Sequence, residues 1–303
     1  MNTWIKTNGL SFIVAITLAT ISTANANELP LLWTLDNFDQ PESVITNPAD
    51  NAVYISNING QPTELNGKGY ISKVSIDGKV INKHWLENLD APKGLAIHGD
   101  NLYIADMQQV HQVSISQGRI VNQFQVKQAK MLNDITIADD GTVYISDLLA
   151  GGIYRISDNQ ITLWFEHENL AHPNGLLWQH GELLVASWGL GMNDDFTTKT
   201  AGSIYTLNIK DVNINQPKLI VIKGSEQLGN LDGLIMKDNA LYVSDWITGE
   251  LFKVEHAKSS KVLTLKPGLA DIGLSSEAAG SEKEGSILFT PSMFDGQVMA
   301  WKL

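Results

Sequence analysis

The stretch VYISD at residues 143–147 decides the fold, because the same pattern returns along almost the whole chain. The typical copy reads apolar, Tyr, apolar, small, and then Asp or Asn. The other copies are VYISN at 53–57, LYIAD at 102–106, a looser LLVAS at 183–187, LYVSD at 241–245 and a degraded LFT at 288–290. From Tyr54 to Leu288 the chain advances 234 residues over five intervals, about 47 residues for each. A fixed period of this length indicates a repeat architecture.

Each repeat has the features of a small antiparallel sheet. A Gly-Leu or Asp-Ile pair comes before most copies, as at residues 94–95 and 134–135, and an alternating strand follows the copy, as at 153–156. A fourth strand often comes next, as at 161–164. Turn sequences such as ADDG at 138–141 separate these strands, and no helical period is sustained. The sequence therefore predicts an all-β fold, namely a six-bladed β-propeller with four-stranded blades.

The two ends of the chain are expected to meet. The sixth repeat contains only three candidate strands, at residues 272–274, 287–289 and 298–301. The segment Leu31–Leu35 precedes the first repeat, and it would expose Trp33 and its leucines if it stayed unpaired. We therefore expect this N-terminal strand to close the last blade, so that residues 27–303 form a single propeller domain.

The first 26 residues have the pattern of a secretory signal peptide. Lys6 provides a modest positive charge, residues 10–18 form a short apolar run, and Ala-Asn-Ala at 24–26 matches a cleavage site. The apolar run is too short to span a bilayer comfortably. We therefore expect an exported protein, periplasmic or secreted, without a membrane segment once residues 1–26 are removed.

Composition excludes several classes of function. The 303 residues carry 33 Asp and Glu against 21 Lys and Arg, a net charge of −12, which has the wrong sign for a nucleic-acid partner. The chain has no cysteine, so thiol catalysis, zinc–thiolate sites and iron–sulfur clusters are impossible. Serine-hydrolase and nucleotide-binding motifs are also missing from the sequence.

Polar residues just before the innermost strands form the most informative set. In a propeller these positions converge from successive blades on the mouth of the central channel. They are Glu42, Lys93, Asn133, Asn174 and Asp232, with Asp271 in the sixth position. A single Asn or Asp before Gly is usually a turn residue, but here the register repeats from blade to blade. Carboxylate and amide oxygens without Cys or clustered His favour a hard cation, Ca²⁺ rather than Zn²⁺.

At these residues the chain resembles the SMP-30/gluconolactonase/LRE-like family of six-bladed propellers. The similar motifs are PESV at 41–44, LND at 132–134, PNGL at 173–176 and LDGL at 231–234. The resemblance implies that Glu42, Asn174 and Asp232 are direct metal ligands and that Asp232 also acts as the general base. It further implies that Asn133 holds the substrate or a water on the metal.

One position departs from the family pattern. Lactonases of the family place an arginine two residues before the blade-three asparagine, where it grips sugar hydroxyls, but this chain has Met131 there and Lys130 one step earlier. Met131 and Lys93 thus join Asn133 as candidates for contact with the substrate, and a sugar-acid lactone is put in doubt. Residues 188–201 form a long insertion in the fourth repeat, interpreted either as a solvated loop or as a lid over the channel mouth.

Two classes of function stay open from the sequence. The first is an exported metal-dependent hydrolase that opens a small-molecule lactone or ester. The second is a non-catalytic propeller that binds a protein, a glycan or a small molecule, with any calcium serving the structure. Because propellers host both, the fold alone does not choose between them.

Overall fold

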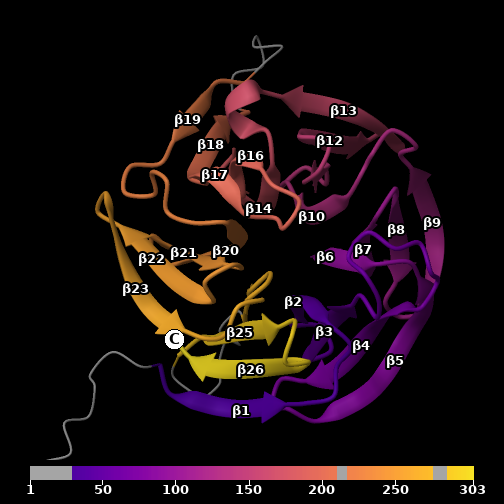
Figure 1. Cartoon of the computed structure of the whole chain (residues 1–303). Helices are drawn as coiled ribbons and strands as arrows, with labels where there is room; N and C mark the ends of the chain where they lie inside the picture. Colours follow the sequence, from indigo (N-terminus) through magenta and orange to yellow (C-terminus); the bar gives the residue numbers. More distant parts are fainter. Residues whose placement is uncertain (1–28, 210–216, 276–284) are drawn as a thin grey trace, which may run out of the picture.

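The computed structural model describes residues 29–209, 217–275 and 285–303. The predicted signal peptide lies outside the described residues, so it stays a prediction. Six four-stranded antiparallel sheets stand around a central axis like blades, and Figure 1 shows the ring viewed along that axis. The predicted all-β, six-bladed propeller is confirmed. No helix in the described part of the chain is long and apolar enough to cross a membrane.

Within each of the first five blades the strands run from the axis outwards in chain order, and in the sixth the N-terminal strand takes the outermost place. The first blade contains β2 (Pro41–Asn47), β3 (Ala52–Asn57), β4 (Gly69–Ser75) and β5 (Val80–Leu89). The second contains β6 (Pro92–His98), β7 (Asn101–Asp106), β8 (Gln109–Ser114) and β9 (Arg119–Gln125). The third contains β10 (Leu132–Ile137), β11 (Val143–Asp147), β12 (Gly152–Ser157) and β13 (Gln160–Glu166). A short 3₁₀ helix, η1 (Glu168–Leu170), leads into the fourth blade.

The remaining blades follow the same plan with one insertion. The fourth contains β14 (Pro173–Gln179), β15 (Glu182–Ser187), β18 (Ile204–Asn208) and β19 (Leu219–Val221). A separate hairpin of β16 (Gly189–Met192) and β17 (Thr198–Ala201) is inserted between β15 and β18. The fifth contains β20 (Leu231–Lys237), β21 (Ala240–Asp245), β22 (Glu250–Glu255) and β23 (Lys258–Thr264). The sixth contains β24 (Gly273–Leu274), β25 (Ile287–Ser292), β26 (Gln297–Lys302) and β1 (Leu31–Leu35).

Strand β1 closes the ring as the sequence predicts. It pairs antiparallel with β26, with Trp33 opposite Ala300 and Leu35 opposite Val298. The Trp33 indole packs on Phe289 with ring centroids 5.7 Å apart, and its Nε1 donates a hydrogen bond to the Ile76 carbonyl in the first blade. One N-terminal strand thus completes the last blade and also ties it to the first.

The hydrophobic core lies mainly between neighbouring blades. One cluster joins Ala105 and Phe124 of the second blade to Ile135 and Ile145 of the third, and similar clusters fill other gaps around the ring. Each blade buries its two faces against its two neighbours, so full burial of the core requires a closed ring.

In the second and third blades, residues at the end of the repeated pattern hold the entry to the inner strand. The Asp147 carboxylate accepts hydrogen bonds from the backbone amides of Lys130 and Met131, and Asp106 does the same for Asp90 and Ala91. Ser146, the small residue before Asp147, accepts at its Oγ a hydrogen bond from the backbone amide of Asp134, inside the inner strand. The repeat motif therefore positions the residues that converge on the axis.

Candidate functional site

A β-bulge at the start of an inner strand aims each candidate side chain at the channel mouth. The register between β2 and β3 shifts between Pro41 and Val44, and a similar shift occurs in each of the next four blades. The second residue of the strand lies inside the bulge and escapes ordinary strand alternation. These second residues are Glu42, Lys93, Asn133, Asn174 and Asp232. The five residues thus share one position, as the sequence predicts, but that position lies inside each inner strand rather than just before it.

The glycines that follow these residues serve close packing of the inner strands. A Cβ at Gly175 would lie 1.9 Å from the carbonyl oxygen of Asp232 in the next blade, and one at Gly233 would lie 2.2 Å from the Ile272 amide nitrogen. Real Cβ atoms do not approach so closely. Asn-Gly and Asp-Gly thus mark neighbouring strands in contact at the axis, and no turn occurs there.

Four of the converging residues present a buried oxygen without a partner. Within the described segments, Glu42 Oε2, Asn133 Oδ1, Asn174 Oδ1 and Asp232 Oδ1 are the buried side-chain oxygens that accept no hydrogen bond. Asn174 donates its amide nitrogen to the Leu231 carbonyl at 3.1 Å, which fixes the rotamer and leaves its oxygen free. Buried polar atoms are almost always satisfied, so four unsatisfied oxygens at one place indicate a missing electropositive ligand.

The electrostatics of these carboxylates indicate the same ligand. Burial, followed by repulsion from Asp232 and Asp271, raises the pKa of Glu42 well above its usual value. Burial and Asp271 raise the pKa of Asp232 in the same way, with the neighbouring Asn174 amide opposing the rise. Two buried carboxylates without a compensating charge are costly, and a bound cation would remove that cost.

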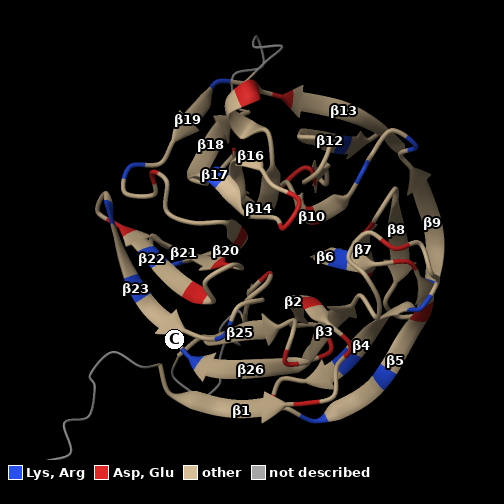
Figure 2. Ribbon diagram, in the orientation of Figure 1, with Lys and Arg blue, Asp and Glu red and all other residues tan. Residues whose placement is uncertain are grey.

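Lys93 compensates the charge of these carboxylates only in part: burial and the neighbouring Asp232 and Asp271 raise the pKa of Glu42 by more than Lys93 lowers it. Its side chain is fully buried, and Nζ donates to the Ala91 carbonyl at 2.8 Å and lies 3.5 Å from Met107 Sδ. Burial lowers its pKa to about 8, against the opposing influence of Glu42 and Asp106. Lys93 belongs to β6, whose ribbon is partly blue near the axis in Figure 2, and it lines the same cavity as Glu42.

Two further acids lie next to the ring and already have partners. Asp271 Oδ2 accepts a hydrogen bond from Ser43 Oγ at 2.5 Å, and burial, opposed by that bond, raises the Asp271 pKa to about 7. Asp134 accepts bonds from the amides of Ile135 and Leu176, both at 2.6 Å, and so joins blades three and four. Sequence reasoning gave Asp134 no role, although it occupies the position where several other blades have glycine.

The donor set fits a hard cation. Two carboxylates and two amides offer oxygen ligands from four blades, which is the chemistry that Ca²⁺ prefers and that Zn²⁺ does not. No group of three or more His, Cys, Asp or Glu among the described residues is arranged to hold a metal. A site here would therefore depend on the amide oxygens of Asn133 and Asn174, and on waters or substrate for its other positions.

A cavity of about 60 Å³ opens over this ring. Its polar floor consists of Glu42, Lys93, Asn133 and Asp232, whereas its walls are largely apolar and include Met131. On the other side of the ring a separate channel of about 320 Å³ is lined mainly by aliphatic inner-strand residues. The site thus lies at a constriction between an apolar pocket and the central channel.

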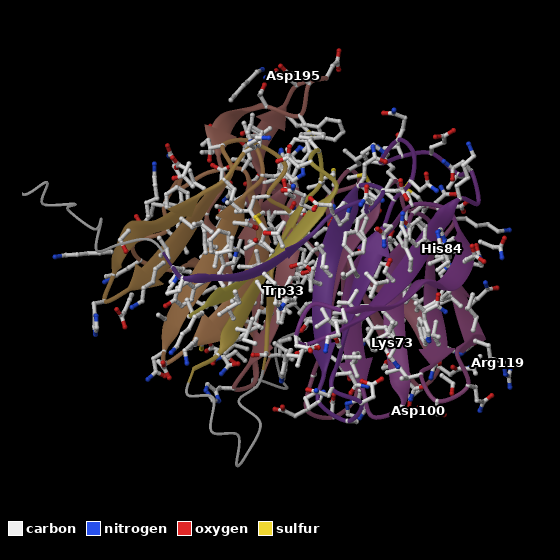
Figure 3. The ribbon with its side chains drawn as sticks, turned by 90° about the horizontal axis from the view of Figure 1, so that it is seen from below. Trp33, Lys73, His84, Asp100, Arg119 and Asp195 are labelled. Atoms are coloured by element: carbon white, nitrogen blue, oxygen red, sulfur yellow. The ribbon has the colours of Figure 1, made fainter. Side chains whose placement is uncertain are left out.

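The insertion at residues 188–201 forms a hairpin, which corrects the expectation of a loop. Trp188 Nε1 donates to the Phe196 carbonyl at 2.7 Å, and both side chains line the cavity. Its two acids, Asp194 and Asp195, are exposed and do not line the cavity. Figure 3 places Asp195 on one face of the ring and Asp100 on the opposite face, so the hairpin stands over the mouth. His172 Nδ1 donates a hydrogen bond to the Leu148 carbonyl at 2.8 Å, and this side chain takes no part in the cavity lining.

Comparison with known proteins confirms the fold and gives the class of its neighbours. The sequence matches no protein-family model and no curated protein. Among solved structures it is similar to a protein assigned to the gluconolactonases, with a TM-score of 0.64, 16% identity, and 92% of each chain covered. A gluconolactonase from Xanthomonas campestris has a TM-score of 0.64 and 16% identity over 90% of this chain and 89% of that one.

A second group of similar structures contains lyases. Virginiamycin B lyase from Staphylococcus aureus has a TM-score of 0.58 and 14% identity, covering 89% of this chain and 98% of that one. At these identities the likeness is one of fold. The protein is therefore a six-bladed propeller whose structural neighbours include enzymes of both kinds.

Proposed function

We propose that the protein is an exported, calcium-dependent hydrolase of lactones or esters. The observation that carries the proposal is the group of four buried, unpartnered oxygens on Glu42, Asn133, Asn174 and Asp232. Glu42, Asn133 and Asp232 line the floor of the cavity over the ring, and Asn174 lies beside Asp232 in the neighbouring inner strand. The two gluconolactonase neighbours support the same reaction type.

The chain's own residues suit hydrolysis of a carbonyl compound. Glu42, Asn174 and Asp232 would hold the cation, which would polarise the carbonyl oxygen and lower the pKa of a nearby water. Asp232 Oδ1 accepts no hydrogen bond, so it is free to take a proton from a water that enters the cavity. Asn133 Oδ1 is free in the same way and would orient that water or the substrate. The apolar walls would exclude other water from the reacting group.

A structural calcium in a non-catalytic propeller is the second candidate. The four residues are at most 5% exposed and the cavity above them is small, which would also suit a sealed ion. A propeller of this kind would bind its ligand elsewhere, and the metal would only join the inner strands.

Hydrolysis of a panel of lactones and esters, with and without calcium, separates the two candidates. We expect turnover of at least one compound that depends on calcium and gives the hydroxy acid or the free acid as product. Because some neighbours are lyases, the product must be identified: an unsaturated product would mean elimination. Calcium binding without turnover of any compound would overturn the hydrolase and leave the structural site.

A further inference from the structure

The walls of the cavity over the ring are apolar almost throughout. Its described lining contains four polar side chains, all on the floor: Lys93 and three residues that the proposed function uses, Glu42, Asn133 and Asp232. The walls come from several blades and from the β16–β17 hairpin. They consist of Ile58, Pro62, Met131, Leu148, Trp188, Phe196, Trp246 and Met293. The buried members of this set pack together as one hydrophobic cluster.

The polar groups beside the Trp188 wall are already engaged. Trp188 Nε1 donates to the Phe196 carbonyl, so the indole offers the cavity only carbon atoms. Asn230 donates its amide nitrogen to the Trp188 carbonyl and to Thr198 Oγ1, and so holds the hairpin in place. A substrate rich in hydroxyl groups would lose its hydration at these walls without gaining hydrogen bonds, which costs free energy for every buried hydroxyl.

An aromatic path leads from the cavity to the surface. The Trp188 and Trp246 rings lie 5.7 Å apart, and Trp246 meets Phe294 edge to face at 5.0 Å. Phe294 is 61% exposed, the most exposed large hydrophobic residue in the described part of the chain. A bare aromatic side chain continuous with an apolar pocket indicates a surface that an apolar ligand covers.

We propose that the natural substrate is a lactone or ester with an apolar chain, which lies along Trp188, Trp246 and Phe294 while the carbonyl group reaches the polar floor. This substrate class rests on the proposed hydrolase function. The geometry disfavours a polyhydroxylated lactone, because the wall at Met131 and Trp188 offers no hydrogen-bonding group. Burial of one methylene group changes binding by about fourfold.

A homologous series of lactones tests the substrate class. We would measure kcat/KM for γ-lactones whose side chain grows from methyl to hexyl, beside a polyhydroxylated lactone of similar ring size. We expect kcat/KM to rise by up to about fourfold for each methylene until the chain passes Phe294. A preference for the polyhydroxylated lactone would overturn the substrate class and leave the hydrolase intact.

A surface variant locates the chain. Phe294→Ala removes an exposed ring, so the fold should survive, and Leu163→Ala removes a 42% exposed side chain from the outer strand β13 as a matched control. We expect Phe294→Ala to lower kcat/KM severalfold for the hexyl lactone and to leave the methyl lactone unchanged. An equal effect on both lactones, or the same effect in Leu163→Ala, would contradict the proposed path.

A binding measurement keeps this inference separate from catalysis. Alkyl lactams resist hydrolysis but keep the shape of the lactones. Their binding can be followed by tryptophan fluorescence in the wild type and by a competition assay in the Trp246→Phe variant. We expect lactam affinity to rise with chain length even if no lactone or ester is turned over. If lactam affinity rises with chain length but no lactone or ester is hydrolysed, the hydrolase function alone is refuted. If lactam affinity does not depend on chain length, the apolar site is refuted.

Discussion

Asp232 is the one residue to which the proposed function gives two chemical roles. It is buried in the bulge of β20, its pKa is raised by burial and by Asp271, and one of its oxygens has no partner. We assign it two roles, as an oxygen ligand of the cation and as the acceptor of a proton from water. The two roles can be separated by a substitution that keeps the oxygen.

Asp232→Asn should reduce hydrolysis far more than it reduces calcium binding. The amide keeps one oxygen for the cation but cannot accept the proton, and loss of a general base typically lowers the rate by about 10²–10⁴-fold. Initial rates on the best lactone and the calcium-induced shift in Tm would be measured together. Asp139→Asn, at an exposed turn residue of the third blade, is the control and should change neither. Full activity in Asp232→Asn would exclude its role as the base.

Asp106 tests the structural role of the repeat motif. Burial alone would raise its pKa, but hydrogen bonds involving His111 and the amides of Asp90 and Ala91 outweigh burial and hold the pKa below 3.8. Because the folded pKa is depressed, the stabilisation is present above pH 3.8 and is lost as pH falls through the folded value.

We therefore expect Asp106→Asn to destabilise the protein at neutral pH by about 1–3 kcal/mol, the usual cost of unsatisfied buried donors. The difference in unfolding free energy from the wild type should shrink as the pH falls below 3.8. Urea unfolding of both proteins across that range is the measurement. A difference that does not vary with pH would mean that ionised Asp106 contributes nothing.

The site residues could be predicted from sequence because one register repeats in five blades. Glu42, Asn133, Asn174 and Asp232 occupy the same position in their strands, so their convergence follows from the repeat alone. The burial of Lys93 and its bond to the Ala91 carbonyl could not be foreseen, because lysine at a single position is usually solvated. Asp134 was missed because its contact with Leu176 joins residues 42 positions apart.

At the scale of elements, one short strand and one short hairpin decide the properties of the ring. Strand β1 closes the sixth blade, and the β16–β17 hairpin builds a wall of the cavity. The first was predictable, since an apolar LLWTL segment and a three-stranded last repeat complement each other. The second was not, because the glycines of GLGM normally indicate a loop. Gly189 is needed there because a Cβ would lie 2.4 Å from the Thr200 carbonyl oxygen of the partner strand.

Trp33 should hold the closing strand in place. Trp33→Ala removes the contact with Phe289, the hydrogen bond to Ile76 and the packing over Gly78 in the first blade. Loss of a fully buried Trp typically costs about 3–5 kcal/mol, so we expect about 2 kcal/mol for this half-buried ring. Leu31→Ala, at a residue of the same strand that is 52% exposed, serves as the control. Equal melting temperatures for the two variants would contradict this role.

Removal of β1 should have a larger effect than either substitution. Deleting Leu31–Leu35 leaves the edge of β26 unpaired and exposes one face of the sixth blade. We expect destabilisation well beyond the ±0.5 kcal/mol of ordinary surface changes. Thermal unfolding of the deletion variant measures it, and an unchanged Tm would refute closure by this strand.

At the scale of the whole molecule, the ring brings equivalent residues of the sequence repeats together in one site. Each of the first five blades contributes one bulged residue to the axis, and at contacts such as those of Gly175 and Gly233 the neighbouring inner strands approach so closely that glycine is required. The period of about 47 residues was enough to predict this architecture. The apolar character of the cavity walls could not be predicted from the repeat, because Trp188, Trp246 and Met293 come from connections that differ between blades.

The central claim is that Glu42, Asn174 and Asp232 hold calcium through their unpartnered oxygens, and calcium-induced stabilisation tests it most directly. Thermal unfolding would be followed for metal-free protein with increasing calcium, in the wild type, in Glu42→Gln and in Glu168→Gln, an exposed glutamate in η1. We predict stabilisation of about 2.7 kcal/mol at a hundredfold excess over Kd in the wild type and in Glu168→Gln. Glu42→Gln should lose most of it, because one of only two carboxylate ligands is gone. No stabilisation, or equal stabilisation in all three proteins, would contradict a calcium site at the channel mouth.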